Sequence, residues 1–572
     1  NANTYTHQSN LTTFNFSHYI NDKWNIKGSI GRLFTNLRAD ANGRPFREET
    51  VDEIKDPRSI VSEPVKLFNP KDSLVFPFPG PGVMNNGGIA TLWHDHYAKE
   101  WTFKASANHY PKNKHHELEF GIQHKLLEYQ WIDVTRPWVG APIKINDSVS
   151  TPSVSIGTSN DIWHVKPNKG GMYIKDKITY KRIIATLGMR LNYWAPGKFA
   201  DNAVNDPNTL MLDKVRKDYK NETFKMLGLR YKARLLPKLN VSFPVTDNYT
   251  MYFNYGHSMR LPHPRFLYAG LDPKFQDRSF LSRLGNPNLD PEVSVSYELG
   301  LKAMVNEDLG FTLTAYNNDK FDYVVTRTIQ IRDQTGRFVN KTFNINQDFA
   351  KIVGVELGVN KRFGKLLKIN FNGSYQVATG KSNSAAESLL QIKNNGSVNT
   401  TKERFLAWDR PFNLKLSVIF SGDSTMSLFG MPLKNFNAFL NMNFKSGMRY
   451  TPHKLVDTND LGRPLYERIP DKRNAEVSKP WFWTDLRLIK DFPFKNKNAV
   501  LSLSIKFSNL FDSRNGQIIN PVTGEAYRRG DPVPSSWRDP EHPDPQASGT
   551  PPTNPARFKA PLHIMYGISF KF

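Results

Sequence analysis

Apolar and polar side chains alternate along this chain in segments of about ten residues. In 499–508 the apolar residues of one parity are Leu501, Leu503, Ile505 and Phe507. The segments 293–302 and 367–377 alternate in the same way. Because successive side chains of a strand point to opposite faces, each segment predicts a strand with one apolar and one polar face.

The connections between these segments alternate between short turns and long loops. Polar turns such as 21–23 and 244–247 join the two segments of a pair, whereas long loops separate successive pairs. A two-sheet sandwich also has period-two faces, but it does not regularly place short turns on one side and long loops on the other. That asymmetry is typical of outer-membrane barrels, whose turns are periplasmic and whose loops are extracellular. The sequence therefore predicts an all-β fold, a transmembrane antiparallel β-barrel.

The last ten residues, HIMYGISFKF, predict the closing strand of this barrel. Its apolar parity consists of Ile564, Tyr566, Ile568, Phe570 and Phe572. Ten residues tilted by about 45° rise roughly 23 Å, close to the apolar band of a membrane-spanning strand. A soluble edge strand is rarely apolar to the end of the chain, because an open edge promotes aggregation. We expect Tyr566, Gly567, Ile568, Phe570 and Phe572 to close the barrel and to carry its assembly signal.

Composition excludes several other classes of protein. The mean hydropathy of -0.54 and the absence of an apolar run near the roughly 20 residues of a membrane helix exclude a helical membrane protein. The chain has no cysteine, so neither disulfides nor thiolate chemistry are expected. Its net charge of +24 is spread over turns, loops and polar strand faces without a recognition helix, which argues against nucleic acid. Anionic lipid headgroups or an acidic ligand fit this charge better.

The segments predict about seventeen strands. Bacterial single-chain barrels have even strand numbers, because both termini lie on the periplasmic side. The final strand descends to the periplasm, and counting back places the first predicted strand in the same direction. We therefore expect an odd number of further strands before residue 1 and a longer protein of which these residues form the C-terminal portion.

Three neighbouring motifs resemble the barrel signature of TonB-dependent outer-membrane receptors. They are GNPNLDPE (285–292), VSYELGLK (295–302) and NYGHSMRLP (254–262). Downstream, KIVGVELGV (351–359), FSNLFD (507–512) and the terminal Phe572 are similar to segments of that family. The segment INPVTGEAYRRGD (519–531) resembles the Oar-like, carboxypeptidase-regulatory-domain receptors of Bacteroidetes-type bacteria.

The resemblance implies energy-coupled import across the outer membrane of a Gram-negative bacterium. It implies a barrel of about 22 strands with a plugged lumen, in which residues 1–572 are one barrel domain. The plug, the TonB box and the earlier strands then lie outside these residues. The implied partners are outer-membrane lipid, the TonB–ExbB–ExbD system through the plug, the barrel-assembly machinery, and a surface lipoprotein or other outer-membrane subunits. No cofactor is expected.

Catalytic and metal motifs are scarce. GxSxG, HExxH and P-loop sequences do not occur, so no enzyme is predicted. His94 and His96 lie on one face of an extended segment and form a possible metal pair. Because the sequence shows no third ligand nearby, no metal site is predicted.

Ligand recognition is expected from the extracellular loops and the upper lumen. Aromatic and arginine side chains supply large, directional contacts at binding surfaces. The candidates are Trp138, Arg260, Tyr268, Arg283, Trp408 and Arg410. Glu298 and Glu356 are on the polar parity of their strands, so we expect them to face the lumen and the plug. Pairing with a luminal Lys or Arg is favoured there over contact with the plug or a place on a transport path.

Two other functions are compatible with a barrel. A structural or docking role in a larger outer-membrane complex is one, and the Pro-rich loop before Pro561 suits docking. A passive porin is the other, with an open lumen and an inward-folded constriction loop. The ligand stays open among siderophore, cobalamin, glycan, peptide and protein.

Overall fold

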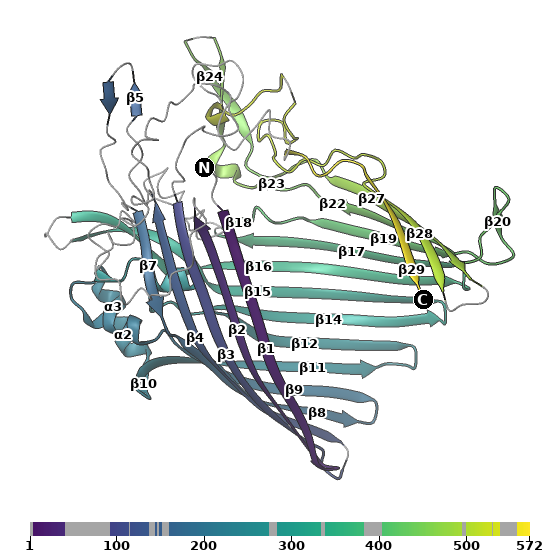
Figure 1. Ribbon diagram of the computed structural model, residues 1–572, viewed down its shortest axis with the longest axis horizontal. Helices are drawn as coiled ribbons and strands as arrows, with labels where there is room; N and C mark the ends of the chain where they lie inside the picture. The colour runs from purple at the N-terminus through teal and green to yellow at the C-terminus, as the bar shows by residue number, and fades with distance from the viewer. Residues whose placement is uncertain are drawn as a thin grey trace.

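A curved antiparallel sheet forms most of the molecule (Figure 1). The computed structural model describes residues 4–40, 92–113, 115–135, 143–145, 148–150, 159–273, 283–332, 338–381, 403–460, 462–494, 499–528, 530–537 and 557–572. In these residues the main sheet has 21 strands, of which one short strand pairs in parallel. The all-β prediction is confirmed.

Seventeen of these strands are long and follow one another around the wall. They are β1 (Thr4–Asn21), β2 (Trp24–Asp40), β3 (Leu92–His109), β4 (His116–Thr135), β8 (Asn168–Tyr180), β9 (Ile183–Ala195), β11 (Leu229–Pro244), β12 (Tyr249–Arg260), β14 (Glu292–Asn306), β15 (Leu309–Arg332), β16 (Phe338–Phe363), β17 (Leu367–Gly380), β19 (Phe412–Ser421), β22 (Phe436–Lys445), β27 (Trp481–Pro493), β28 (Val500–Ser508) and β29 (His563–Lys571). The other four are β7 (Ser159–Val165), β10 (Phe224–Met226), β13 (Arg283–Leu284) and β18 (Arg404–Phe405). The predicted number of about seventeen spanning strands is therefore confirmed.

The remaining elements belong to the connections. They are β5 (Ile143–Ile145), β6 (Ser148–Ser150), α2 (Lys198–Asn205), α3 (Asp213–Glu222), α4 (Pro264–Tyr268), β20 (Ser427–Leu428), β21 (Met431–Pro432), β23 (Arg449–Tyr450), β24 (His453–Thr458), β25 (Pro464–Arg468), η4 (Pro470–Lys472), β26 (Glu476–Val477) and η5 (Ser535–Trp537). In Figure 1, α2 and α3 lie at the left-hand ends of the strands, opposite the short turns. None of the helices described is long and apolar enough to cross a membrane.

The short turns are stabilised locally. Asn21 Oδ1 accepts hydrogen bonds from the backbone N–H groups of Lys23, at 2.9 Å, and Trp24, at 3.1 Å. Asparagine side chains stabilise turns in this way, which explains why a short polar sequence reverses the chain between β1 and β2. Gly364 has a φ of 56° in the turn between β16 and β17, a conformation that glycine adopts without steric cost.

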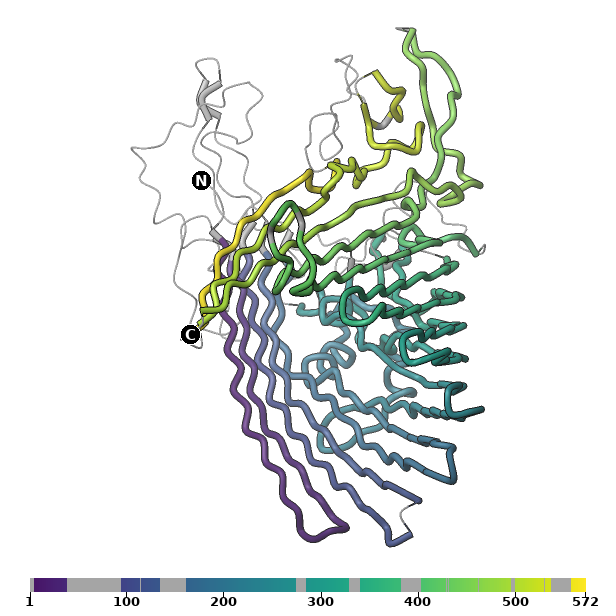
Figure 2. Tube along the Cα trace, turned by 90° about the vertical axis from the view of Figure 1, so that its right-hand side faces the viewer, coloured from purple at the N-terminus to yellow at the C-terminus, as the bar shows by residue number. Residues whose placement is uncertain are grey.

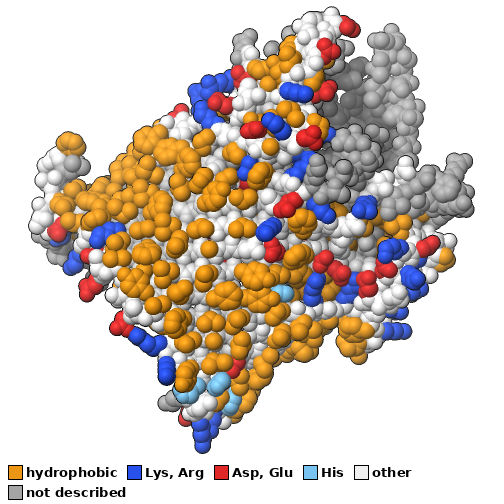
Figure 3. Space-filling model, turned by 180° about the vertical axis from the view of Figure 1, so that it is seen from behind, with side chains coloured by type: hydrophobic (Ala, Val, Ile, Leu, Met, Phe, Trp, Pro, Cys, Tyr) orange, Lys and Arg blue, Asp and Glu red, His pale blue; other side chains and the backbone are white. Residues whose placement is uncertain are grey.

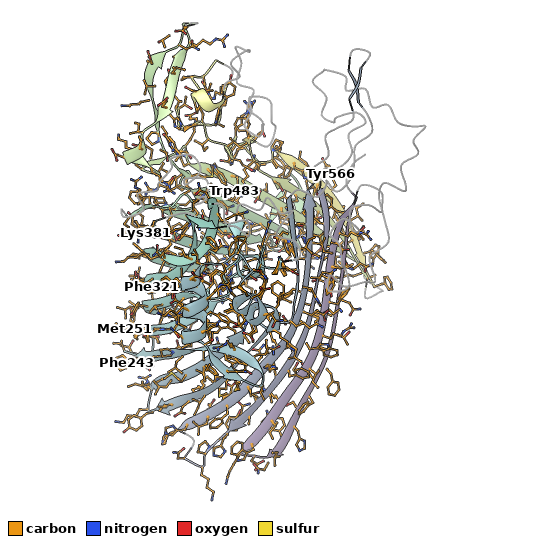
Figure 4. The ribbon with its side chains drawn as sticks, turned by 90° about the vertical axis from the view of Figure 1, so that its left-hand side faces the viewer. Phe243, Met251, Phe321, Lys381, Trp483 and Tyr566 are labelled. Carbon is orange, nitrogen blue, oxygen red and sulfur yellow. The ribbon has the colours of Figure 1, made fainter. Side chains whose placement is uncertain are left out.

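The two faces of the wall differ in polarity as the alternation predicts. Apolar side chains such as Leu299, Leu313 and Val355 are exposed on the outer face. Figure 3 shows a broad hydrophobic surface on one side of the molecule. In Figure 4, Phe243 and Met251 point outward from the wall. Such a surface is favourable only against lipid, because an apolar patch of this extent facing water would aggregate.

The outer face becomes polar toward the extracellular ends of the strands. Trp101 of β3 lies opposite Leu126 of β4, and both side chains are exposed. Two residues closer to the extracellular end, Lys99 and Glu128 form an ion pair at 3.4 Å. Glu128 also accepts a hydrogen bond of 2.8 Å from the Tyr97 hydroxyl. Charged groups at this height mark the upper limit of the apolar band, so β7 and the loop helices lie beyond it.

The last strand is exposed on both of its faces, so its exposure does not distinguish an apolar from a polar face. Tyr566, Ile568, Phe570 and Phe572 are exposed, and β29 pairs with β28 along its whole length. Among the strands described, β1 pairs only with β2 and β29 only with β28. These two strands are thus the edges of the curved sheet, and Figure 2 shows how the wall curls between them.

Small apolar cores hold the extracellular connections against the wall. Trp163, Val165, Ala200 and Tyr268 form one cluster, which joins β7, α2 and α4. A second cluster, centred on the fully buried Tyr219 and Leu271, holds α3 against α2. These connections are therefore packed structure rather than loose chain.

Candidate functional site

A polar and aromatic cluster occupies the inner face of the wall at the extracellular ends of β3, β4 and β7. In β3 the outward parity is that of Trp101 and Phe103, so His94 and His96 face inward. The register places His94 opposite Asp133 and His96 opposite Trp131. Directly opposite residues of an antiparallel pair have side chains on the same face, which brings these four side chains together.

The two imidazoles converge on one carboxylate oxygen. His94 Nδ1 and His96 Nε2 both contact Asp133 Oδ1, the latter at 2.6 Å. Trp131 Nε1–H donates to the other oxygen, Oδ2, at 2.9 Å. All three titratable side chains are mostly buried but keep an exposed edge, with 13–19% of each side chain accessible.

Asp161 on β7 adds a second carboxylate directly opposite Asp133. It is 1% exposed, accepts a 3.0 Å hydrogen bond from Trp163 Nε1–H and pairs with Arg265 Nε at 2.8 Å. Burial raises the pKa of Asp161 to about 6, and the Asp133 charge adds to the rise, while Arg265 opposes it. The two carboxylates therefore lie side by side on the upper inner wall, Asp161 paired with Arg265 and Asp133 with the two imidazoles.

Stacked aromatic rings connect this cluster to α4. His96 stacks on Trp131 with ring centroids 3.7 Å apart, and Trp131 lies parallel to Trp163 at 5.6 Å. Trp163 in turn contacts Tyr268, at 5.5 Å. Stacked rings resist rotation about their side-chain torsions, so the orientation of the His96 ring is fixed by the packing.

A pocket of about 260 Å³ opens beside the cluster. Its lining includes Lys169, Arg260, His263 and Tyr268, with Leu127, Tyr129, Trp194 and several prolines. Burial, followed by the positive charges of Arg265 and Arg260, lowers the pKa of His263. The pocket thus combines an apolar floor with two cationic side chains.

The GNPNLDPE motif fastens α4 in place. The Gly285 N–H donates to Ala269 O at 2.7 Å and the Asn286 N–H donates to Phe266 O at 2.8 Å. A Cβ at Gly285 would lie 2.6 Å from Leu267 O, too close for any other residue. This explains why a glycine stands at the start of the motif.

Asparagines of β16 hold the other side of the same motif. Asn286 Nδ2 donates to Asn344 O at 2.9 Å, and the Asn344 side chain, which is completely buried, donates to Phe266 O at 3.3 Å. Asn346 Nδ2 donates to Asp290 O at 3.0 Å. The motif is therefore a structural clamp that ties the β12–β14 connection to the wall.

The structure brings two of the six predicted ligand-binding residues together. Arg260 and Tyr268 line the same pocket, although the Tyr268 hydroxyl is buried and donates to Pro196 O at 2.8 Å. Trp408 is exposed, and Arg410 lies over the Trp481 ring at 3.9 Å, near the starts of β19 and β27. Trp138, the side chain of Arg283 and residues 538–556 of the Pro-rich loop lie outside the described residues.

Glu298 and Glu356 lie on the strand parity opposite the exposed Leu299 and Val355. Glu298 accepts a 3.0 Å hydrogen bond from Asn254 Nδ2. An amide of the neighbouring strand thus contacts Glu298, where the sequence favoured a Lys or Arg.

A second pocket, of about 430 Å³, lies in the connections around β28 and β29. It is lined by Lys479, Arg514, Arg528, Arg557 and other residues, with Glu525 as its acidic member. Much of this lining belongs to the segment 519–531.

Sequence reasoning missed Asp133 and the ion pair of Asp409 with Arg449. Asp133 is 37 residues from His96, and only the strand register, set over the whole length of β3 and β4, brings them together. The sequence held one usable signal. Pairing the two alternating segments residue by residue outward from their turn at 112–114 places Asp133 opposite His94. Asp409 lies between two predicted ligand-binding residues, Trp408 and Arg410. Its ion-pair partner, Arg449, is 40 residues away in the sequence, so no local pattern indicates the pair.

The comparisons identify the class of protein. The family model described as "TonB dependent receptor-like, beta-barrel" matches residues 1–510. The chain therefore belongs to the TonB-dependent receptor β-barrel family and is an integral protein of the outer membrane, as the motifs predict. No curated protein matches this sequence.

Solved structures show the same fold. The outer membrane transporter YddB from Escherichia coli is 11% identical, with a TM-score of 0.55 over 89% of this chain and 60% of its own. The pyoverdine receptor FpvA from Pseudomonas aeruginosa PAO1 is 12% identical, with a TM-score of 0.51 over 90% of this chain and 58% of its own. The chain thus spans about three fifths of the length of these structures.

Proposed function

We propose that this chain is the transmembrane wall of a TonB-dependent transporter that imports a ligand across the outer membrane. In this proposal residues 1–572 are one barrel domain, and energy comes from the TonB–ExbB–ExbD system through a plug. Family membership supports the proposal, because the matched family is named for TonB dependence. The transporter and receptor titles of the structures similar in fold agree with it.

The observation that carries the proposal is the packed extracellular end of the inner face. The loop elements α2 and α4 are pinned to the wall through Trp163 and Tyr268, and a pocket of about 260 Å³ lies among them. A preformed concave site with an apolar floor and a few polar groups suits ligand capture. A passive channel has no need for such a site.

An anionic ligand suits this pocket best. Lys169 and Arg260 both line it, and the whole chain carries a net charge of +24. Cationic side chains in a concave site of low dielectric concentrate anions near them. This proposal leaves the chemical family of the ligand open.

The finer assignments are also proposals. The segment 519–531 supports an Oar-like, Bacteroidetes-type receptor. The exposed aromatic terminus, with Tyr566 and Phe572, supports recognition by the barrel-assembly machinery. A surface lipoprotein would dock on the extracellular connections. We propose no enzymatic activity.

The test uses the full-length protein purified from outer membranes. In planar lipid bilayers it should be electrically silent, and its co-isolation with the periplasmic domain of TonB should be measured in the same preparation. Stable TonB capture together with silent bilayers supports the transporter. Steady open channels without TonB capture would establish the porin instead.

The docking function gives a different result in the same preparation. It predicts silent bilayers, no TonB capture, and stoichiometric co-purification with other outer-membrane subunits. For the docking function, deleting the gene for this protein should cause the same additional growth defect in a strain that lacks TonB as in one that has it. For the transporter, the two deletions should give the same growth defect, with no additive effect.

A further inference from the structure

We propose that His94, His96 and Asp133 bind a divalent transition-metal cation of the Zn²⁺ class at the extracellular end of the inner wall. Each side chain offers one ligand atom, and the three atoms lie within 4.8 Å of one another. Among the described residues, no other group of three or more His, Cys, Asp or Glu side chains has its ligand atoms this close together. The metal binding is independent of the proposed import function.

The donor set fits this class of cation. Two imidazole nitrogens and one carboxylate oxygen are the donors that Zn²⁺ and related ions accept, at about 2.0–2.2 Å. Ligand atoms around a tetrahedral ion with such bonds lie about 3.3 Å apart. His96 Nε2 and Asp133 Oδ1, now 2.6 Å apart, need to separate by less than about 1 Å to admit the ion. Hard cations such as Mg²⁺ prefer oxygen ligands and fit this set less well.

The strand register builds the site without any loop. His94 and His96 are two residues apart in β3, so both face inward, and Asp133 lies directly opposite His94 in β4. The two strands pair without a break from Leu92 to His109 in β3 and from Leu118 to Thr135 in β4, which fixes the backbone positions of all three ligands. Sites on rigid elements hold ligands more accurately than sites on loops.

Neighbouring side chains orient two of the ligands. The Trp131 N–H holds Asp133 Oδ2, so the other oxygen is turned toward the imidazoles. The Trp131 ring also stacks against His96, with 16° between the planes. Partners of this kind are typical of metal sites, and their loss commonly lowers affinity about 10–100-fold.

The local charges favour a cation. Asp161 is paired in register with Asp133, so two carboxylates face this part of the inner wall. Arg265 compensates Asp161 at 2.8 Å and contacts the Trp131 ring, at 5.9 Å from its centroid. A dication would neutralise the charge of Asp133 and leave one positive charge in excess, because the Asp161–Arg265 pair is already neutral.

Three protein ligands leave at least one coordination position open. Part of each ligand side chain is accessible, so the open position faces the inner space at the extracellular end. A bound ion there accepts water or a donor atom of a small molecule, as in metal sites with three protein ligands. The cation itself has two sources, free metal ion or the metal of a soluble chelate.

The first measurement titrates Co²⁺ into full-length protein purified from outer membranes and stripped with a chelator. We expect one Co²⁺ per chain with visible absorption bands of a four- or five-coordinate site, and displacement of these bands by Zn²⁺. His94→Gln, His96→Gln and Asp133→Asn should each weaken binding by about tenfold or more. Trp131→Phe keeps an aromatic ring, removes the hydrogen bond and should weaken binding about 10–100-fold.

The matched control is His116→Gln. His116 also contacts a carboxylate across two strands, Asp176 at 2.8 Å, but no second imidazole joins that pair among the described side chains. This variant should bind Co²⁺ like the unmodified protein. Heat-modifiable migration in gels shows that each variant is a folded barrel. Absence of stoichiometric Co²⁺ binding to the unmodified protein, or equal binding by the folded ligand variants, would overturn the proposal.

A second titration distinguishes the two sources of metal. Ni²⁺ alone and Ni²⁺–iminodiacetate, which has three open positions to match the three protein ligands, are compared on the same protein. If the unmodified protein binds both the free ion and the chelate, and His96→Gln binds neither, the site accepts the metal of a chelate. Binding of Ni²⁺ alone supports a site for free cation, and binding of neither contradicts the metal site. None of these results depends on TonB, so the import proposal stands or fails separately.

Discussion

A single buried ion pair decides the local stability of the connection between β17 and β19. Asp409 is completely buried, pairs with Arg449 Nε at 2.9 Å and accepts the Ala378 N–H at 3.0 Å. Arg449→Met leaves this carboxylate without its cation. We expect a loss of about 3–5 kcal/mol in the free energy of unfolding, measured by urea titration in lipid vesicles at pH 7.

The pH dependence of this variant follows from the same burial. Burial already raises the pKa of Asp409, and Arg449 opposes that rise. Without Arg449 the pKa rises further, so the carboxyl group is protonated at a higher pH and its burial costs less as the pH falls. The difference in free energy of unfolding between Arg449→Met and the unmodified protein should therefore become smaller as the pH is lowered. Arg182→Met, at the exposed pair with Asp247, should cost less than about 1 kcal/mol at either pH.

At the scale of elements, the β12–β14 connection depends on the close approach at Gly285. Gly285→Ala forces a Cβ against Leu267 O and Ala269 N, both within 2.8 Å. We expect α4 to detach from the wall, since neither backbone atom is free to move away. Limited digestion with trypsin measures this detachment, and cleavage after Arg265 should become several times faster than in the unmodified protein.

Gly256→Ala is the control for this element. Gly256 lies in β12, where a Cβ would meet only Lys238 Cγ, at an ordinary 3.6 Å. Its rate of cleavage after Arg265 should match that of the unmodified protein. If Gly285→Ala is cleaved there no faster than Gly256→Ala, the clamp tolerates the added methyl group and the prediction is wrong.

At the scale of the whole molecule, the lipid-facing surface determines where the wall is stable. Leu313 is exposed on the outer face, and Thr312 is on the inner face opposite Lys302. Leu313→Arg places a charge in lipid and should cost about 2–4 kcal/mol, falling toward the interfaces. Thr312→Arg carries the same charge to the inner face and should cost less than about 1 kcal/mol. Urea unfolding of both variants in the same vesicles makes the comparison, and equal costs would mean that the two faces are not separated as described.

The sequence by itself determined the class of fold, the strands and their orientation. Period-two alternation is local information, and each turn, such as the one at Asn21, carries its own hydrogen-bonding side chain. The seventeen long strands therefore fall where the pattern predicts. Lipid in place of water outside the wall makes this pattern unambiguous, because the outward face must be apolar.

Only the tertiary structure decided which distant residues meet. The pair His94 and His96 was visible in the sequence, but Asp133 joins them through the register of two strands, and Asp409 finds Arg449 through the packing of loops. GNPNLDPE was recognisable as a motif, yet its role as a clamp depends on Asn344 and Asn346, more than fifty residues away. Local patterns specify strands because neighbouring residues alone set them, whereas a site combines side chains whose proximity is fixed by the pairing of the whole sheet.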